Sequence, residues 1–452
     1  MAIIPKKAII NGNSANIINA IRNEDTTTFS FEPASYNIDS ISNIGNLILA
    51  SPIMQNKFID TLINRIAKVV YTSLSYENPW SALKQGMLET GEVVEEIAFN
   101  LCDVHEYDTS EDSEFPKQEK PDVYTAFHKL NYTKYYKSTI NRARLRQAFT
   151  TLDGVEELAQ YIINTMYTSA EYDEFLAMKY LIGRTALNSL FTPVIIPEVK
   201  TENMKTIASK IKSLSNELTF MRTTYNPYGL STNTKKENQI VIVNSDFDAL
   251  LDVEVLAFAF NMDKADFNGR RILIDNFNTG EVARMTELLG SNSDYKEFTE
   301  EEINKLNTIP AFIIDDRFFM IFDNLIETND FYNPEKLYFN YWLHTWKIIS
   351  NSPFVNAVML TSETPTYESV TISPKELTVT KGQTAQFSAT VAGTGFYNVG
   401  VKYEIVEATE NSTLTKDGKL YVGVNEENTT LTIKAISVGD NSITDTATVT
   451  VK

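Results

Sequence analysis

The feature that most constrains the fold is a change in composition near residue 365. The sequence before this point is rich in aromatic residues and mixes helical with strand-like patterns. From Glu368 to Lys452 it is dominated by Thr, Val, Ser and Gly in short alternating runs, such as SVTISP, LTVTKG and DTATVTVK. Such runs, each ending in turn residues, are typical of an all-β sandwich. We therefore predict a separate β domain at 368–452, joined to the body by a linker at 363–367.

The charge of the chain restricts its partners. Lys and Arg number 40 and Asp and Glu number 59, which gives a net charge of −19. A protein that grips DNA neutralises phosphates with clustered basic residues, so this charge argues against DNA binding as the main task. No apolar run is long enough to cross a membrane, and the N terminus predicts no secretory signal.

Cysteine usage indicates a reducing compartment. Cys102 is the only cysteine, so intrachain disulfides are excluded and a cytosolic folding environment fits. Because Cys102 follows an apolar run, we expect it to be a buried or half-buried apolar side chain.

The first 365 residues predict an α+β body rather than a regular βαβ repeat. Apolar residues at helical spacing predict a long helix at 153–182, with Asp153 as its N-cap and Gly183 as its left-handed stop, and further helices at 201–220 and from Asp246. The aromatic run at 337–349 and several short apolar runs predict strands, namely 239–243, 271–275, 311–315, 318–322 and 354–361. Residues 315–317 are expected to form a hairpin turn.

Two segments are expected to need a partner. Residues 1–55 are rich in Asn and Ser and predict an arm that packs on something else. Within 77–150, strand-like stretches flank the acidic tract 103–122, and the basic tract 129–146 follows. Neighbouring blocks of opposite charge predict ion pairs between subunits. The candidate residues are Asp108, Glu111, Asp112, Glu114, Lys129, Lys134, Lys137, Arg142, Arg144 and Arg146.

No motif for catalysis, phosphate binding or metal binding occurs, so no catalytic, cofactor or metal residue is assigned and no enzymatic activity is predicted. A nucleophilic triad has no local support, although triads are assembled in space. Asp315 and Asp316, with Asp323 and Glu327 nearby, could hold a divalent cation, but a solvated turn is the preferred interpretation. His344 is expected to be a packed, hydrogen-bonded strand residue.

The basic tract has a second interpretation. Tyr132, Tyr135 and Tyr136 alternate with lysines and could stack on single-stranded bases. The acidic tract directly upstream and the negative net charge of the chain disfavour binding of a nucleic acid. Contact between subunits is therefore the preferred interpretation of the basic tract.

Read in order, many segments resemble the major capsid protein of small short-tailed double-stranded-DNA phages with protein-primed replication. The resemblance rests on IINAIRN (17–23), FIDTLINRIAKVVY (58–71), ENPW (77–80), GEVVEEI (91–97), SAEYDEFLAMKYLI (169–182), DVEVLAFAFNM (252–262), FFMIFDNL (318–325), LYFNYWLHTW (337–346) and FVNAV (354–358).

This resemblance implies the tailed-phage major capsid fold. Its parts would be an N-terminal arm at 1–55 and a body at 56–362, which contains an extended loop at 77–150, a spine helix of the peripheral domain at 153–182 and an axial domain at 200–330. The C-terminal domain resembles bacterial Ig-like group 2 domains through 370–391, 417–423 and 431–435, with Tyr403 where Trp is common.

The implied function is self-assembly into an icosahedral or prolate head, built of hexamers and pentamers in the bacterial cytoplasm. The implied partners are scaffolding and portal proteins and packaged double-stranded DNA bound without sequence specificity; no cofactor is implied. Two other classes stay open. One is a bacterial surface adhesin or carbohydrate-binding protein with an Ig-like module, against which the missing signal peptide counts. The other is an intracellular hydrolase.

Overall fold

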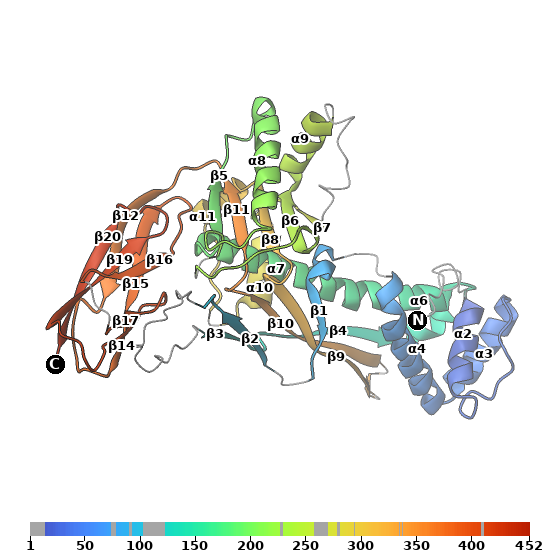
Figure 1. Cartoon of the computed structure of the whole chain (residues 1–452). Helices are drawn as coiled ribbons and strands as arrows, with labels where there is room; N and C mark the ends of the chain where they lie inside the picture. Colours follow the sequence, from blue (N-terminus) through green and yellow to red (C-terminus); the bar gives the residue numbers. More distant parts are fainter. Residues whose placement is uncertain are drawn as a thin grey trace, which may run out of the picture. The chain divides into compact units, whose positions relative to one another are not determined.

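The structure is a computed structural model of the chain (Figure 1). It describes residues 14–73, 78–89, 93–102, 123–226, 229–256, 270–277, 281–292, 294–333, 335–336, 338–407 and 411–452. The chain divides into two compact units. Unit 1 comprises Met1–Glu92, Lys129–Ala177 and Ile321–Ile349, and unit 2 comprises Val93–His128, Met178–Met320 and Ser350–Lys452.

The N-terminal segment of unit 1 is helical and packs on its own chain. Helices α2 (Ser14–Glu24), α3 (Ile38–Ala50) and α4 (Pro52–Ser73) follow one another. Ile18 of α2 and Ile41 of α3 are buried in one apolar cluster with Phe149, Val155 and Phe339. Apolar residues three and four apart place one stripe of each helix against this core. Residues 14–50 therefore contribute apolar side chains to the core of unit 1, and their role as an arm in assembly stays a prediction.

The sheet of unit 1 has the strand order β1-β9-β10-β4. Its strands are β1 (Lys84–Met87), β4 (Tyr132–Asn141), β9 (Phe319–Asn333) and β10 (Tyr338–Asn351), with a 3-10 turn at Pro79–Leu83 before β1. β10 and β4 are antiparallel, from Tyr338 opposite Asn141 to Lys347 opposite Tyr132. The prediction of a strand at 337–349 is confirmed.

The long helix is confirmed but it does not end where predicted. Short α5 (Arg142–Ala148) precedes it, and then α6 (Gly154–Ile162), a π-helical turn (Ile163–Tyr167) and α7 (Thr168–Leu187) follow without a break. Gly183 lies inside α7, and an added Cβ would lie 2.7 Å from Cζ of Phe298. The left-handed residue after the helix is Ser189, with φ of 56°. Gly183 therefore serves close packing rather than helix termination.

The central sheet of unit 2 has the order β5-β11-β8-β6-β7. These strands are β5 (Thr192–Ile195), β6 (Gln239–Asn244), β7 (Arg270–Ile274), β8 (Ala311–Asp315) and β11 (Ala357–Thr361). Helices α8 (Met204–Glu217) and α9 (Ser245–Leu256) bury their apolar stripes against this sheet in one cluster. Two shorter helices, α10 (Val282–Leu289) and α11 (Glu300–Asn307), complete this part.

The turn at 315–317 is not a hairpin. β8 pairs within the central sheet, whereas β9 pairs with β1 and β10. Asp315 is also buried, with 1% of its surface exposed, because it is the last residue of the buried strand β8, and Thr234 and Arg317 hydrogen-bond its carboxylate. The interpretation of this step as a solvated turn is therefore wrong for Asp315.

The C-terminal segment is all-β, as predicted. Its strands are β12 (Thr366–Ser373), β13 (Glu376–Val379), β14 (Thr384–Gln386), β15 (Ser388–Thr394), β16 (Val401–Ile405), β17 (Thr413–Leu414), β18 (Lys419–Tyr421), β19 (Thr430–Ser437) and β20 (Thr444–Val451). They form the sheets β12-β15, β13-β20-β19-β16 and β14-β18-β17, which share one apolar core. Gly418, with φ of 83°, lies in the turn joining the antiparallel strands β17 and β18.

Candidate intersubunit contact surface

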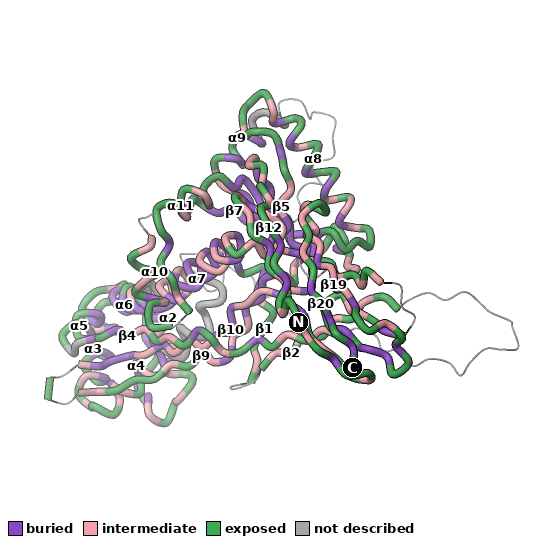
Figure 2. The backbone as a smooth tube through the Cα atoms, turned by 90° about the vertical axis from the view of Figure 1, so that its left-hand side faces the viewer, coloured by how far each residue is buried: buried purple, intermediate pink, exposed green. Residues whose placement is uncertain are grey.

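A two-stranded ribbon in unit 2 exposes an apolar face. β2 (Val94–Phe99) and β3 (Val123–His128) are antiparallel, with Phe99 opposite Val123 and Ile97 opposite Thr125. Exposed and half-buried residues alternate along β2, which is labelled in Figure 2, and along β3 up to buried His128, whereas β8 is buried throughout. Because side chains in a strand alternate between faces, the exposed ones share one face. Glu95 and Thr125 lie on this ribbon face together with four apolar residues. The apolar side chains are Ile97, Phe99, Val123 and Phe127, which are 50%, 64%, 52% and 58% exposed.

The same apolar character continues past the strand ends. Val93 before β2 and Leu101 after it are 49% and 63% exposed. Exposed apolar side chains clustered in this way favour an interaction site, and a two-stranded ribbon is marginally stable alone. The ribbon therefore has an open face that a partner would cover.

The opposite side of the ribbon is held by a polar cluster, the ribbon anchor, formed by Glu96, His128, Ser350 and Ser352. Ser352 Oγ donates to Glu96 Oε1 at 2.6 Å, and His128 Nε2 lies 3.3 Å from Glu96 Oε2. His128 Nδ1 lies 2.7 Å from Ser350 Oγ. His128 is 4% exposed and Glu96 is half-buried, so these bonds are partly shielded from solvent and fix the base of the ribbon.

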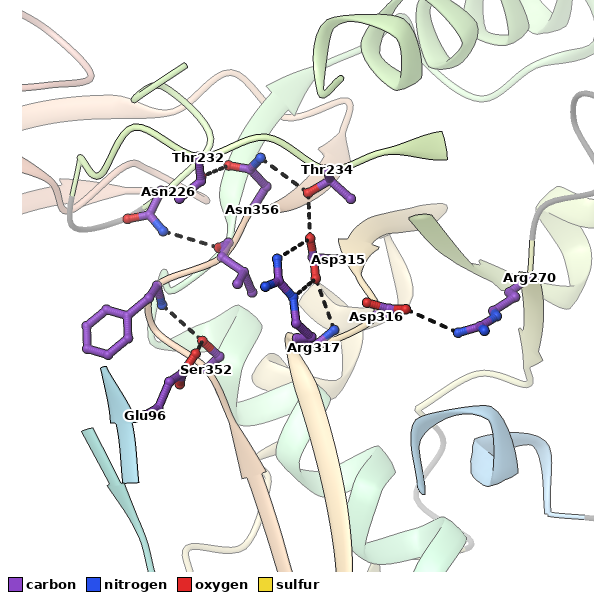
Figure 3. A network of polar contacts seen from close by, with 12 residues as sticks. Glu96, Asn226, Thr232, Thr234, Arg270, Asp315, Asp316, Arg317, Ser352 and Asn356 are labelled. Atoms are coloured by element: carbon purple, nitrogen blue, oxygen red, sulfur yellow. Dashed lines mark hydrogen bonds and ion pairs between the residues drawn. The ribbon is translucent and has the colours of Figure 1, made fainter. Parts of the chain in front are cut away.

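The backbone that leads from Ser352 to Asn356 connects the anchor to a second set of hydrogen bonds at the central sheet of unit 2 (Figure 3). Phe354 N donates to Ser352 Oγ at 3.1 Å, and Asn356 Nδ2 donates to Thr234 Oγ1 at 3.3 Å. Thr234 Oγ1 donates in turn to Asp315 Oδ2 at 2.8 Å. Buried polar groups that are all paired give a rigid support, so the ribbon base is fixed to the sheet.

His128 lies between the Ser350 hydroxyl and the Glu96 carboxylate, which is the hydroxyl–imidazole–carboxylate arrangement of a nucleophilic triad. Sequence reasoning missed this cluster because 222 residues separate Ser350 from His128. The cluster borders a cavity of about 300 Å³ lined by His128 and Ser350 together with Phe127, Phe318 and Leu190. A nucleophile also needs N–H donors for the developing oxyanion. Two nearby donors are engaged, since Ser352 N donates to Phe318 O and Phe354 N to Ser352 Oγ. We interpret the cluster as an anchor.

The predicted charged contacts are only partly described. Asp108, Glu111, Asp112 and Glu114, together with the side chain of Arg142, lie outside the described residues. Lys129 and Arg146 are exposed, and Lys134 is half-buried. Two exposed cations contact rings of their own chain. Lys137 Nζ lies 5.5 Å from the Trp342 ring centre, and the Arg144 guanidinium lies 3.9 Å from that of Tyr161.

The tyrosines of the basic tract do not form a stacking platform. Tyr132 and Tyr136 share a hydrogen bond of 3.0 Å, and Tyr136 Oη donates to Asp173. Burial raises the pKa of both phenols well above the usual value. Tyr135 is 63% exposed and its ring centre lies 5.9 Å from that of half-buried His344. Of the three tyrosines, only Tyr135 is therefore exposed enough to stack on a base, and His344 is half-buried beside its ring.

The structure also bears on the expectations for Cys102 and for a metal site. Cys102, which follows β2, is exposed rather than buried. Among the described residues, no group of three or more His, Cys, Asp or Glu side chains is placed to hold a metal ion. In the same part of the chain, no helix is both long and apolar enough to cross a membrane.

Comparisons with known proteins identify the family. Residues 18–361 match the family model described as Phi29-like phage major capsid protein. The major capsid protein of Bacillus phage PZA is 32% identical over 429 residues, covering 93% of this chain and 89% of that protein. The major capsid protein of Bacillus phage GA-1 is 35% identical over 352 residues, covering 76% of this chain and 68% of that protein. The capsid structure of Staphylococcus phage Andhra has a TM-score of 0.47 at 15% identity, covering 65% of this chain and 86% of that one. The chain belongs to the Phi29-like phage major capsid protein family.

Proposed function

We propose that this capsid protein assembles into a closed shell of hexamers and pentamers around double-stranded DNA, and that the ribbon face is covered by a second copy of the chain. The observation that carries the proposal is the exposed ribbon face, held by a rigid anchor on its other side. Shell subunits meet through heterologous contacts, in which one patch binds a different patch of the next copy. Family membership supports such assembly over the adhesin and hydrolase alternatives.

The energetic argument is the burial of aromatic and aliphatic side chains. Phe99 and Phe127 are each more than half exposed in the single chain. Covering a large apolar side chain contributes about 1.5–3 kcal/mol relative to leaving it in water. Repeated at every subunit of a shell, this gain offsets the cost of ordering the contact.

The finer assignment of parts belongs to the same proposal. We assign residues 1–55 as the N-terminal arm, 77–150 as the extended loop, 153–182 as the spine helix and 200–330 as the axial domain of a tailed-phage capsid fold. The family match ends at residue 361, which supports a separate module at 368–452. Its all-β core supports assignment as a bacterial Ig-like group 2 domain.

Assembly partners follow from the family's function. We propose assembly in the bacterial cytoplasm with scaffolding and portal proteins. The net charge of −19 disfavours tight phosphate binding, which suits a shell that DNA must enter and leave.

The ribbon proposal is tested by replacing Phe99 and Phe127 together with Asp. Because both side chains lie on the open face, the variant should fold but form no shells in negative-stain microscopy. The control is Val424→Asp, since Val424 is 67% exposed in the β domain. We expect normal shells from this control. Normal shells from the Phe99→Asp/Phe127→Asp protein would refute the ribbon contact.

The charged tracts are the second proposed contact, between 103–122 of one copy and 129–146 of the next. Exposed ion pairs contribute about 0–1 kcal/mol each, so a set must be reversed together. Replacing Arg142, Arg144 and Arg146 with Glu should prevent assembly and leave the subunit folded. Since Arg144 also packs on Tyr161, Lys129→Glu/Arg146→Glu serves as a variant that keeps this contact. Wild-type particle yields from both variants would contradict charge pairing.

A further inference from the structure

A buried polar cluster in unit 1 has no role in the assembly described above. Its centre is Glu174 of α7, whose side chain is 0% exposed. Glu174 Oε2 contacts Lys347 Nζ of β10 closely, and Glu174 Oε1 accepts a hydrogen bond from Asn78 Nδ2 at 2.6 Å. The Lys347 amine and the Asn78 carboxamide therefore each contact a different oxygen of one buried carboxylate.

The carboxamide of Asn78 is polarised from its other end. Asn78 Oδ1 accepts a hydrogen bond from Trp80 N at 3.0 Å, at the start of the 3-10 turn. A backbone N–H on a carbonyl oxygen stabilises negative charge that develops there when a nucleophile attacks the carbon. Asn78 is 5% exposed, so this donor acts away from bulk water.

Aromatic rings enclose the cluster. Trp80 is fully buried, and its ring lies stacked on Phe175 with centres 5.9 Å apart. Trp80 Nε1 donates to Phe175 O at 3.3 Å, which fixes the indole. Exclusion of water strengthens the electrostatic interactions inside and disfavours hydrolysis of an amide formed there.

We propose that Lys347 and Asn78 form an intrachain isopeptide bond, with Glu174 as the proton relay. Lys347 Nζ gives a proton to Glu174 Oε2 and attacks Cγ of Asn78. The Glu174 carboxyl passes this proton to Nδ2, the C–N bond to Nδ2 breaks, and the departing ammonia takes the second proton from the attacking nitrogen and leaves as ammonium ion. One ammonium side chain and one carboxamide thus become one amide and one ammonium ion, without any oxidant or cofactor.

Two neighbouring carboxylates hold the amine of Lys347 in its protonated form before the step. Asp323 Oδ1 lies 2.8 Å from Lys347 Nζ and orients the amine. Burial lowers the pKa of Lys347, but Glu174 and Asp323 outweigh this and raise it above the usual value, so the reaction starts from the ammonium form. Lys84 Nζ also lies 3.1 Å from Glu174 Oε1, but it pairs with Glu171 and its side chain is 25% exposed, against 4% for Lys347.

The bond would close a covalent loop from Asn78 to Lys347. A crosslink over a long loop stabilises mainly by restricting the unfolded chain. It would join the segment that leads into β1 to β10 across β9, the strand that lies between them in the sheet. The crosslink would therefore reinforce the unit 1 sheet against unfolding.

Mass spectrometry of the full-length chain tests the proposal. We expect an intact mass lower than the sequence mass by one ammonia, and a branched peptide that links Asn78 to Lys347 after proteolysis. Lys347→Arg and Glu174→Gln should restore the full mass expected for each variant. The matched control Lys84→Arg should still lose ammonia.

Wild-type protein of full mass would overturn the proposal, whether or not the variants fold. A loss of ammonia without the branched peptide, or a branch at Lys84, would overturn it as well.

Discussion

At the scale of residues, Glu407 connects the pH of the solution to the stability of the β domain. Thr432 donates to Glu407 from its backbone N–H and, at 2.6 Å, from its hydroxyl. Partial burial raises the pKa of Glu407, but the Thr432 bonds prevail and hold it below the ordinary 4.5. A carboxylate with a lowered folded-state pKa stabilises the fold above its ordinary pKa and loses this contribution as pH falls through the folded value.

We therefore expect acid to weaken the wild-type β domain more than a Glu407→Gln variant. Thermal unfolding of both proteins between about pH 6 and pH 3 measures this, because only the wild type has this carboxylate to protonate. The melting temperatures of the two proteins should converge as the pH falls. A constant gap between them across the range would contradict the role of Glu407.

Gly183 shows where residue-level prediction from the sequence fails. The apolar spacing before it predicts the long helix correctly, and a glycine after such a run normally indicates its end. In the structure, Gly183 instead gives room to the ring of Phe298, which is distant in sequence. A contact between distant residues leaves no local pattern, so the same glycine predicts termination from sequence and serves packing in the fold.

At the scale of elements, the attachment of α3 depends on Gly45. An added Cβ on Gly45 would lie 2.4 Å from Cβ of Phe149, which the main chain cannot avoid without moving. We expect Gly45→Leu to destabilise the docking of α3 by about 1–3 kcal/mol or more, the usual cost of overpacking. Hydrogen exchange should then increase across 38–50.

The control for Gly45 is the same substitution at the next position, which points outward. Asn46 is exposed on α3, so Asn46→Leu should leave exchange in this helix unchanged. Equal exchange in wild type and Gly45→Leu would show that the helix does not depend on this close contact.

The two segments that were expected to need a partner, 1–55 and 77–150, differ in how far their described parts pack on their own chain. Both segments are expected from the sequence to need a partner. The N-terminal helices find their apolar partners around Phe149 and Phe339 of the same chain. The β2–β3 ribbon leaves Phe99 and Phe127 exposed. Its alternation could be read from the sequence, but whether a layer covers a strand depends on tertiary contacts that alternation does not encode.

At the scale of the whole molecule, the division into an α+β body and an all-β C-terminal segment followed from composition and periodicity alone. The order of the segments resembling phage capsid proteins indicated the family, which the comparisons confirm. The ribbon anchor and the Glu174 cluster could not be predicted in this way. Each assembles polar residues from distant parts of the sequence, and single polar residues carry no periodic signal.

The central claim is that the apolar ribbon face becomes buried between copies when the shell forms. Hydroxyl-radical footprinting, read by mass spectrometry, measures side-chain accessibility directly on free subunits and on purified particles. We predict that labelling of Phe99 and Phe127 falls severalfold on assembly, while Tyr421 of the β domain, 39% exposed in the single chain, serves as the internal reference. Equal labelling of Phe99 and Phe127 in subunits and particles would contradict the account.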